Sequence, residues 1–341
     1  MSRSKVLYRI SKDTFIQYTN GKICLNDQKI ALLPLPYLYI LASRIRILTR
    51  LLRIEPRDIE KLTNNQFVVC ALHKTWLLDI HKKSIKELVP NRKGWSNPLN
   101  LCTDGKCVYW GDYGNNEKRE SVNIYRLNSD LKVEVVYSFY QGIVRHVHNI
   151  VWDKMHHRFF ILTGDMEKTS GIYVADSDWR TVEPVVTGRQ QYRAVAAFPC
   201  RDGLIYATDS VTEENQICLL QEGKVIYLCS FPGSCIYGTE TKSYYVFAST
   251  VEPPEGRGFF DMFTYKLGSG IKDRYSHLVI VNKKNLKVKE ILKVKKDIWP
   301  MKLLQYGTLM FSKGQEGIDD ELWYYVMACK GDGHTKKIML Y

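Results

Sequence analysis

The chain has 341 residues, of which 45% are hydrophobic and 25% charged, a composition typical of folded globular proteins and unlike that of disordered ones. Its 49 Lys and Arg against 36 Asp and Glu give a formal net charge of +13, which favours anionic partners such as acidic glycans, nucleic acid or phospholipid, although a solvated Lys-rich surface accounts for most of the excess. No stretch approaches the roughly eighteen apolar residues of a membrane-spanning helix, which excludes that class of protein.

The cysteines and the N-terminal stretch indicate a reducing compartment. Nine cysteines are scattered without the CxxC spacing of a metal site, mostly within apolar strand patterns. Cys102 and Cys107 flank a turn, so that a disulfide between them is conceivable but not favoured. The N-terminal stretch MSRSKVLYRISKDTF has no apolar segment of the signal-peptide kind. We therefore expect a cytoplasmic, non-integral protein with reduced thiols.

A strand–turn–strand element recurs seven times along the chain. Its copies lie at 21–33, 75–88, 122–139, 171–188, 216–231, 277–292 and 322–340. A second pair of strands lies between the copies, clearest at 148–165 and 193–210 and also present at 98–113, 236–250 and 301–313. Four strands in each unit of about 45 residues are the signature of a β-propeller blade.

The repeat predicts an all-β fold, a seven-bladed β-propeller with four-stranded antiparallel blades. Residues 1–341 are expected to form a single domain, with a short helical insertion at 37–53 and a Pro/Gly-rich insertion at 251–272. A β-sandwich with a second domain is the alternative, and the regular period across the chain disfavours it.

The segment 37–53, YLYILASRIRILTRLLR, breaks the strand pattern. Its apolar residues recur at helical spacing, at Leu41, Ile45, Leu48 and Leu52. We predict a helix, or a helix leading into a strand, between the first and second blades. The basic stretch Arg44–Arg53 could rest on an anionic membrane surface, but packing of the apolar side on the propeller is the more common arrangement.

The densest group of ionisable side chains lies in the hairpin 144–165, VRHVHNIVWDKMHHRFFILTGD. In an antiparallel blade, the start of the innermost strand and the end of the second strand meet at one face. The repeat therefore predicts that seven residues gather at the mouth of the channel: His146, His148, Tyr192 and Arg193 at the starts of inner strands, and Asp112, Asp165 and Asp209 at the ends of second strands. His156 and His157 fall in the opposite turn, where solvent is expected.

The pair His146 and His148 has two interpretations. On a strand, this spacing places both imidazoles on one side about 7 Å apart. Such a pair suits general acid–base chemistry near neutral pH or two metal ligands. The alternative is a hydrogen-bonded structural pair that braces Asp165. Because no third ligand is forced by the spacing, we expect neither a metal nor another cofactor.

Further residues would bind the substrate. Arg193 is expected to project toward the channel mouth, where its guanidinium could hold a carboxylate, while Arg145 alternates with His146 and could face the neighbouring blade. Asp112 and Asp209 are expected to support Asp165. Aromatic walls for a sugar ring are predicted at Trp110, Tyr113 and Trp299.

Several of these stretches resemble a known family. Residues 111–125 (GDYGNNEKRESVNIY), RHVHNIVWD with TGD, SDWRTVEPVVTG at 177–188 and QQYRAV with ATDS resemble the sialidase-type, BNR-repeat propeller proteins found near glycan-processing genes. The stretch at 177–188 is similar to an Asp-box that lacks its Gly and Trp. Propeller-type polysaccharide lyases are a looser parallel, which implies His146 or His148 as base, Tyr192 as acid and Arg193 as carboxylate clamp.

We therefore expect a carbohydrate-active propeller protein that acts on an acidic glycan by lyase- or glycosidase-type chemistry at the channel mouth. The alternative is a non-catalytic propeller that serves as a glycan-binding or protein-interaction platform in polysaccharide biosynthesis. Motifs of nucleotide-dependent enzymes, α/β-type serine hydrolases and zincins do not occur. Nucleic-acid binding would rest on net charge alone, so we expect no nucleic-acid partner and a monomeric protein.

Overall fold

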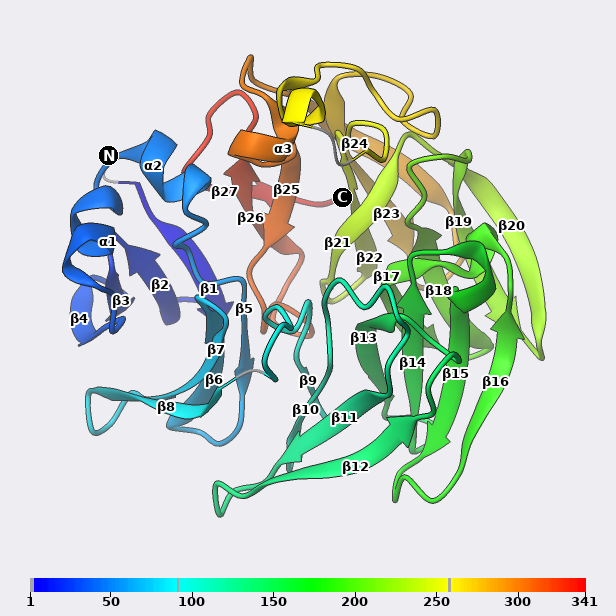
Figure 1. Ribbon diagram of the computed structural model, residues 1–341, viewed down its shortest axis with the longest axis horizontal. Helices are drawn as coiled ribbons and strands as arrows, with labels where there is room; N and C mark the ends of the chain where they lie inside the picture. Colours follow the sequence, from blue (N-terminus) through cyan, green and yellow to red (C-terminus); the bar gives the residue numbers. More distant parts are fainter. Residues whose placement is uncertain (1–2, 91, 257–258) are drawn as a thin grey trace. The chain divides into compact units, whose positions relative to one another are not determined.

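The computed structural model describes residues 3–90, 92–256 and 259–341, which form mainly antiparallel sheets (Figure 1). Seven sheets of consecutive strands follow one another along the chain, six with four strands and the last with three. This succession of meanders is a seven-bladed β-propeller, which confirms the predicted fold class. No helix among these residues is long and apolar enough to cross a membrane.

The chain divides into two compact units. The first unit contains Met1–Glu55, Tyr206–Leu219 and Ile226–Tyr341, and the second contains Pro56–Ile205 and Leu220–Val225. The expectation of one domain over residues 1–341 stays a prediction.

The first unit holds three of the sheets. Their strands are β1 (Lys5–Arg9), β2 (Phe15–Thr19), β3 (Lys22–Leu25) and β4 (Gln28–Leu32); β21 (Ser234–Glu240), β22 (Tyr244–Thr250), β23 (Tyr275–Asn282) and β24 (Val288–Lys295); and β25 (Thr308–Phe311), β26 (Glu321–Met327) and β27 (Thr335–Met339). Its helices are α1 (Tyr37–Ala42), α2 (Arg46–Leu51), α3 (Met301–Leu304) and the 3₁₀ turn η3 (Phe259–Phe263).

The second unit also holds three complete sheets. Their strands are β5 (Asp58–Lys61), β6 (Gln66–Ala71), β7 (Lys74–Asp79) and β8 (Ser84–Pro90); β9 (Cys102–Thr103), β10 (Val108–Gly111), β11 (Val122–Leu127) and β12 (Val133–Phe139); and β13 (His146–Asp153), β14 (Arg158–Gly164), β15 (Gly171–Asp176) and β16 (Val182–Thr187). Two 3₁₀ turns are η1 (Glu167–Thr169) and η2 (Gln190–Tyr192). The remaining sheet, β17 (Ala194–Cys200), β18 (Gly203–Thr208), β19 (Asn215–Gln221) and β20 (Lys224–Phe231), has residues in both units.

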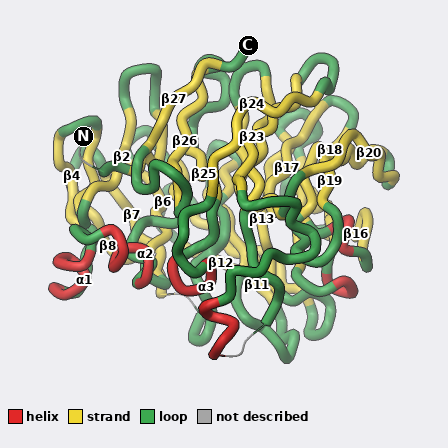
Figure 2. The backbone as a smooth tube through the Cα atoms, turned by 90° about the horizontal axis from the view of Figure 1, so that it is seen from above, coloured by secondary structure: helices red, strands yellow, loops and turns green. Residues whose placement is uncertain are grey.

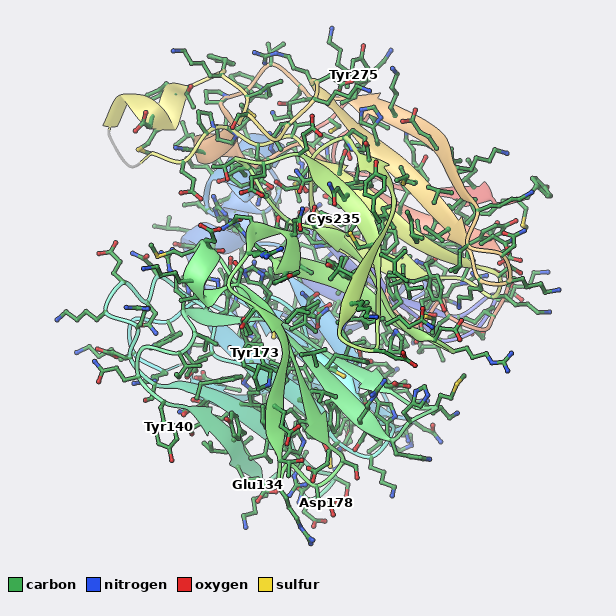
Figure 3. All side chains as sticks on the ribbon, turned by 90° about the vertical axis from the view of Figure 1, so that its right-hand side faces the viewer. Glu134, Tyr140, Tyr173, Asp178, Cys235 and Tyr275 are labelled. Carbon is green, nitrogen blue, oxygen red and sulfur yellow. The ribbon has the colours of Figure 1, made fainter. Side chains whose placement is uncertain are left out.

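Burial falls from the inner to the outer strands of a blade. All six residues of β18 are buried, whereas β20 has exposed residues through most of its length. Strands covered on both faces must be apolar on both faces, and an outer strand keeps one polar side. In the second unit, Tyr109, Phe159 and Tyr173 belong to one buried core, while Asp178 lies in the exposed turn after β15 (Figure 3).

The predicted outer hairpins are all present, because each copy corresponds to the last two strands of one sheet. The prediction for one pair of inner strands is wrong. Residues 301–313 were expected to form two strands, but Met301–Leu304 is the short helix α3. The last sheet therefore has three strands and not the predicted four. The sequence MKLL of α3 contains no β-branched residue, and Pro300 precedes it at the N-cap.

All nine cysteines are thiols without disulfides in the described chain, among them the buried Cys235 (Figure 3).

The predicted helical insertion is present as α1 and α2, but its orientation differs from the favoured expectation. Leu41, Ile45 and Leu52 are exposed, and Arg50 is buried. The Arg50 side chain donates to the carbonyl oxygen of Leu304 and forms an ion pair of 2.6 Å with Asp297. Ion pairing with carboxylates of the first unit therefore turns arginines inward, which directs apolar side chains outward.

A buried ion pair joins the first and last blades of the first unit. Arg9, 1% exposed, donates from both terminal nitrogens to the two carboxylate oxygens of Asp319 at 2.8 Å. Its guanidinium lies 4.9 Å from the centre of the Trp323 ring. The hydrogen bond from Arg9 holds the pKa of the Asp319 carboxyl below its usual range.

We expect Asp319→Asn to lower the free energy of unfolding at neutral pH by about 3 kcal/mol, because it removes the nearer of the two carboxylates that pair with the buried guanidinium and leaves only Glu321, at 3.7 Å. The folded-state pKa of Asp319 is lowered, so the stabilisation is present above the unfolded pKa of about 3.9 and is lost as the pH falls through the folded value. Urea denaturation from neutral pH down to about pH 3 should therefore show the gap to wild type closing. Asp178→Asn, at an exposed carboxyl, is the control, and a gap that stays constant with pH would contradict the prediction.

Candidate functional site

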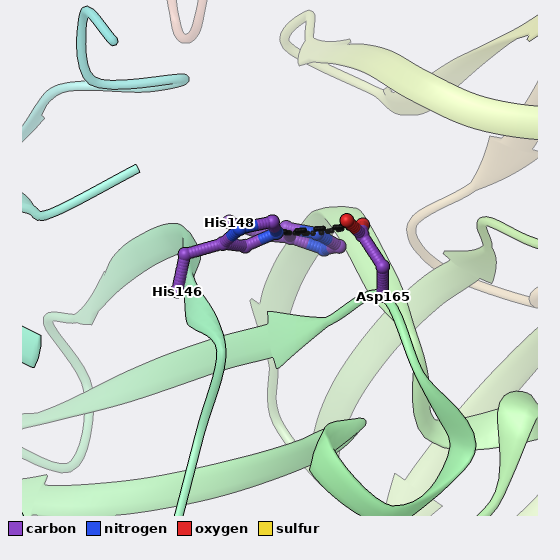
Figure 4. A group of neighbouring side chains, drawn as sticks. All are labelled: His146, His148 and Asp165. Atoms are coloured by element: carbon purple, nitrogen blue, oxygen red, sulfur yellow. Dashed lines mark hydrogen bonds and ion pairs between the residues drawn. The ribbon is translucent and has the colours of Figure 1, made fainter. Parts of the chain in front are cut away.

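Five ionisable residues meet in the second unit, and we call them the histidine cluster: Arg145, His146, His148, Asp165 and Arg193. His146 and His148 lie at the start of β13, Asp165 follows β14 directly, and Arg193 precedes β17. Of the residues that the repeat was expected to gather, His146, His148, Asp165 and Arg193 do meet here. Arg145, for which a position facing the neighbouring blade was the expectation, also contacts Asp165. Figure 4 shows both imidazoles turned toward the carboxylate of Asp165.

The register of β13 explains how two histidines so close in sequence reach one point. Val147 pairs with Thr163 and Asn149 with Leu162, so that His148 is the extra residue of a β-bulge. The strands β1 and β21 carry the same irregularity near their starts. The bulge brings the two ring centres to 5.0 Å, closer than the predicted spacing of about 7 Å along a regular strand.

Asp165 is the shared partner of the cluster. Its Oδ1 lies 3.1 Å from His148 Nε2, 3.4 Å from His146 Nε2 and 3.2 Å from Arg193 Nη2. Its Oδ2 lies 3.5 Å from Arg145 Nη1. Both histidines are 2% exposed, whereas the Asp165 side chain is 26% exposed. The carboxylate is therefore the side from which a ligand could reach the cluster.

Backbone carbonyls select the tautomer of both imidazoles. His146 Nδ1 lies 2.7 Å from the carbonyl oxygen of Gly114, and His148 Nδ1 lies 3.0 Å from that of Ala194. A carbonyl oxygen only accepts, so each Nδ1 carries a hydrogen and donates it. In the neutral rings, both Nε2 atoms then present lone pairs.

Burial and charge set the protonation of the cluster. Burial lowers the pKa of His146, although Asp165 opposes the change. Burial alone would raise the pKa of Asp165, but the contacts with His146 and His148 and the positive charge of Arg193 hold it well below its usual range. At neutral pH we therefore expect a neutral His146 beside an ionised Asp165.

Two buried polar atoms beside Asp165 lack partners among the described residues. They are Nε of Arg145 and Oε1 of Gln190. Gln190 uses its amide nitrogen to donate to the backbone oxygen of Asp165 at 3.1 Å, and Arg145 donates from Nη2 to Asn115 at 2.5 Å. An unsatisfied donor and an unsatisfied acceptor at one place are costly unless a ligand or water completes them.

An aromatic cleft of about 150 Å³ lies against the cluster. Tyr113 lines the cleft, and its ring centre is 4.6 Å from that of His146, so the cleft and the cluster share a wall. Trp95 and Arg92 also line it, and the guanidinium of Arg92 lies 5.2 Å from the Trp95 ring centre. Aromatic faces beside a cation are suited to sugar rings that carry a negative group.

Other predicted residues have different positions. Trp110 lines the cleft but is 6% exposed and stacks on Tyr125. Asp112 is buried and accepts from the Asn123 amide and the Tyr125 hydroxyl, which is a bracing role. Tyr192 is partly buried in η2, and its hydroxyl makes no hydrogen bond within the described chain.

Asp209 and Trp299 belong to the first unit, so that their predicted roles stay predictions.

Sequence reasoning missed four residues outside the repeated strands: Arg92, Trp95 and Asn115, which lie in loops, and Gln190, which begins the 3₁₀ turn η2. The sequence also did not predict a third metal ligand beside His146 and His148. In the structure, one ligand atom from each of His146, His148 and Asp165 lies within 4.8 Å of the others.

Gly164 is required for this packing, because a Cβ added there would lie 2.3 Å from Cε1 of His148. We expect Gly164→Ala to lower the free energy of unfolding by about 1–3 kcal/mol through overpacking. The test is a double-mutant cycle by urea denaturation. In a His148→Ala background the same change should cost much less, and equal costs in both backgrounds would contradict the proposed contact.

No protein-family model matches the chain, and no curated protein matches it. The resemblance to BNR-repeat proteins therefore stays a prediction. Solved structures share the fold: an oligogalacturonate lyase from Vibrio parahaemolyticus is 8% identical, with a TM-score of 0.53 over 93% of this chain and 88% of that chain. An oligogalacturonate lyase in complex with manganese is 9% identical, with a TM-score of 0.52 over 96% and 90%. A prolyl endopeptidase is 10% identical, with a TM-score of 0.55 over 98% of this chain and 49% of that one. At these identities the likeness shows the propeller fold.

Proposed function

We propose that this protein binds an acidic carbohydrate at the histidine cluster and the adjoining aromatic cleft, and acts on it by lyase-type chemistry. The observation that carries the proposal is the pair of unsatisfied polar atoms beside Asp165, Nε of Arg145 and Oε1 of Gln190. Both atoms are shielded from solvent in this structure, so that a ligand would reach them only after a local rearrangement. A uronate would then supply what both require, since its carboxylate accepts from a guanidinium and its hydroxyls donate to an amide oxygen.

The charge of the site favours an anion over a neutral sugar. Arg145 is only 13% exposed in its side chain, and its nearest approach to the Asp165 carboxylate is 3.5 Å. That distance is longer than the roughly 2.8 Å of a strong charge-assisted hydrogen bond, so the guanidinium keeps donor capacity for a second carboxylate. Arg92 also lines the cleft, but it already forms ion pairs of 3.5 Å with Asp112 and Glu120, so the preference for an anion rests on Arg145.

Lyase chemistry needs a base near the proton next to the carboxylate. A neutral imidazole of the cluster would accept that proton, the electron pair of the C–H bond would form a C=C bond, and the bond to the leaving oxygen would break. Arg193 would hold the carboxylate and stabilise the charge that develops on it. Tyr192, next to Arg193 in the chain, would give its hydroxyl proton to the leaving oxygen.

One observation favours a non-catalytic glycan-binding platform as the second candidate. Both Nε2 atoms point at Asp165, and both rings are 2% exposed, so that a substrate proton could reach them only after a rearrangement around Asp165. Both candidates require the same anion-binding residues. They differ only in turnover.

Binding is tested with Arg145→Gln. We expect the affinity for a uronate oligosaccharide, measured by titration calorimetry, to fall about 10- to 100-fold, because one charge-assisted contact of about 1.5–3 kcal/mol is lost. Affinity for a neutral oligosaccharide of the same length should be weak and unchanged. Arg158→Gln, at the opposite end of the β13–β14 hairpin, is the matched control. If neither wild type nor variant distinguishes the two glycans, binding of an acidic carbohydrate is excluded.

Turnover is tested separately on the same glycans by following the absorbance of the unsaturated uronate. We expect activity in the wild type, its loss in His146→Ala/His148→Ala, and a reduced rate in Tyr192→Phe. Retained binding without turnover in the wild type would establish the platform and exclude the lyase.

A further inference from the structure

We propose that His146, His148 and Asp165 form a binding site for a divalent first-row transition metal ion. The inference rests on the site of the proposed function and divides its two candidates, since an ion held by both Nε2 atoms would occupy the lone pairs that an imidazole base needs and would leave binding of the acidic carbohydrate in place. Metal binding itself can be measured without any glycan. The sequence offered only two candidate ligands, His146 and His148, and a metal was not expected because the third ligand, Asp165, comes from a different strand end.

The argument starts from lone pairs. Each Nδ1 donates to a backbone carbonyl, so in their neutral forms the two imidazoles would direct their Nε2 lone pairs at the same point as Oδ1 of Asp165. The two Nε2 atoms lie 3.1 Å apart. Acceptors cannot satisfy one another at such distances, so a cation between them is needed, either a proton or a metal ion.

The distances fit a metal ion. Ligand atoms about 2.1 Å from a metal lie about 3.0 Å apart at a right angle and about 3.4 Å apart at a tetrahedral angle. The three observed separations are 3.1, 3.1 and 3.4 Å. Two imidazoles and one carboxylate are also the donor types of transition-metal sites that leave positions open for substrate or water.

The surroundings match the usual outer contacts of a metal site. The backbone oxygens of Gly114 and Ala194 fix both rings, as the second hydrogen bond of a metal-binding histidine normally does. Arg193 and Arg145 contact the Asp165 carboxylate at 3.2 and 3.5 Å and fix its position. Gly164 leaves room for the His148 ring next to the chain.

The test is calorimetric titration of metal-free protein with Zn²⁺ and, separately, Mn²⁺. We expect one ion per chain and a rise in thermal stability. His148→Gln and Asp165→Asn should each weaken binding more than about 100-fold, since each removes a ligand. His156→Gln, which removes an exposed histidine from the opposite turn, is the matched control and should bind as the wild type does.

A spectroscopic readout keeps the test independent of folding defects in the variants. Co²⁺ bound to the wild-type site should give visible absorption bands that an excess of Zn²⁺ removes. Circular dichroism checks that the variants are folded. The metal proposal would be overturned by stoichiometric binding that survives in both ligand variants, or by the absence of binding in the wild type, and in the second case a proton holds the cluster together. Glycan binding by the metal-free protein bears on the proposed function alone.

A second observation, on the first unit, carries a separate proposal. The helices α1 and α2 expose an apolar surface made of seven side chains: Tyr37, Leu38, Leu41, Ile45, Ile47, Leu51 and Leu52, which are 36–73% exposed. Single exposed apolar residues are ordinary, but seven within the sixteen residues 37–52 are typical of a binding surface. Figure 2 shows α1, α2 and α3 along one edge of this unit.

Charge decides what would cover this surface. Residues 37–53 contain four arginines and no acidic residue. Arg46 and Arg50 are engaged in ion pairs with Asp332, while Arg44 and Arg53 are exposed beside the apolar side chains. Apolar side chains with exposed arginines match the boundary of an anionic bilayer, where acyl chains lie below phosphate groups. We infer that α1 and α2 rest on an anionic lipid surface.

Vesicle co-sedimentation tests this inference. We expect the wild-type protein to sediment with phosphatidylcholine vesicles that contain phosphatidylserine, and much less with phosphatidylcholine alone. Leu38→Glu/Leu41→Glu should reduce the bound fraction at least about fivefold, because two carboxylates would enter the interface. Tyr227→Glu, at an exposed apolar position of β20, is the control and should sediment as the wild type does. Equal sedimentation of wild type and double variant would overturn the inference, as would self-association through this surface without lipid binding.

Discussion

Coverage of both faces of the inner strands is the constraint on which the rest of the structure depends. Strand β14 has six buried residues out of seven, and β18 is buried throughout. Such strands have no solvent face on which to carry polar groups. In the described chain, most ionisable residues therefore lie in the outer strands, the turns and the points where an inner strand begins or ends; the buried Glu60 within β5 is an exception. Arg145, His146 and Asp165 occupy such ends, which places the histidine cluster at the edge of an apolar core.

The same constraint explains why so much of the fold could be predicted. Turn residues and a regular strand pattern mark each outer hairpin, and the period of about 45 residues fixes the blade. The meeting of His146, His148 and Asp165 followed from strand direction alone. What could not be predicted is the bulge at His148, since the register of β13 depends on its pairing with β14 and not on its own residues. The closeness of the imidazoles, and with it the possibility of a third ligand, depends on that register.

The helical insertion shows the opposite case, in which a local pattern is overruled by distant partners. The spacing of Leu41, Ile45 and Leu52 predicts an apolar side that packs inward. The structure turns it outward because Arg46 and Arg50 find Asp332, a residue almost three hundred positions later in the chain. Ion pairs with carboxylates fix the position of an arginine side chain more strongly than partial burial fixes that of a leucine. The local sequence around the helices does not contain these carboxylates, so it could not predict the orientation.

The hydrogen bonds of three arginines distinguish structural from functional roles in this chain. Arg50 directs Nε and its terminal nitrogens at the oxygen of Leu304 and at two carboxylates, so its donors already have acceptors. Arg9 keeps an unmatched Nε, but its guanidinium covers the Trp323 ring and both terminal nitrogens bond to Asp319. Arg145 is partly buried and less completely bonded: its Nη2 donates to Asn115, but its Nε lacks an acceptor among the described residues, and its carboxylate contact is long. A partly buried cation with an unused donor beside two fixed imidazoles costs stability, and the arrangement is explained if a ligand carboxylate completes it.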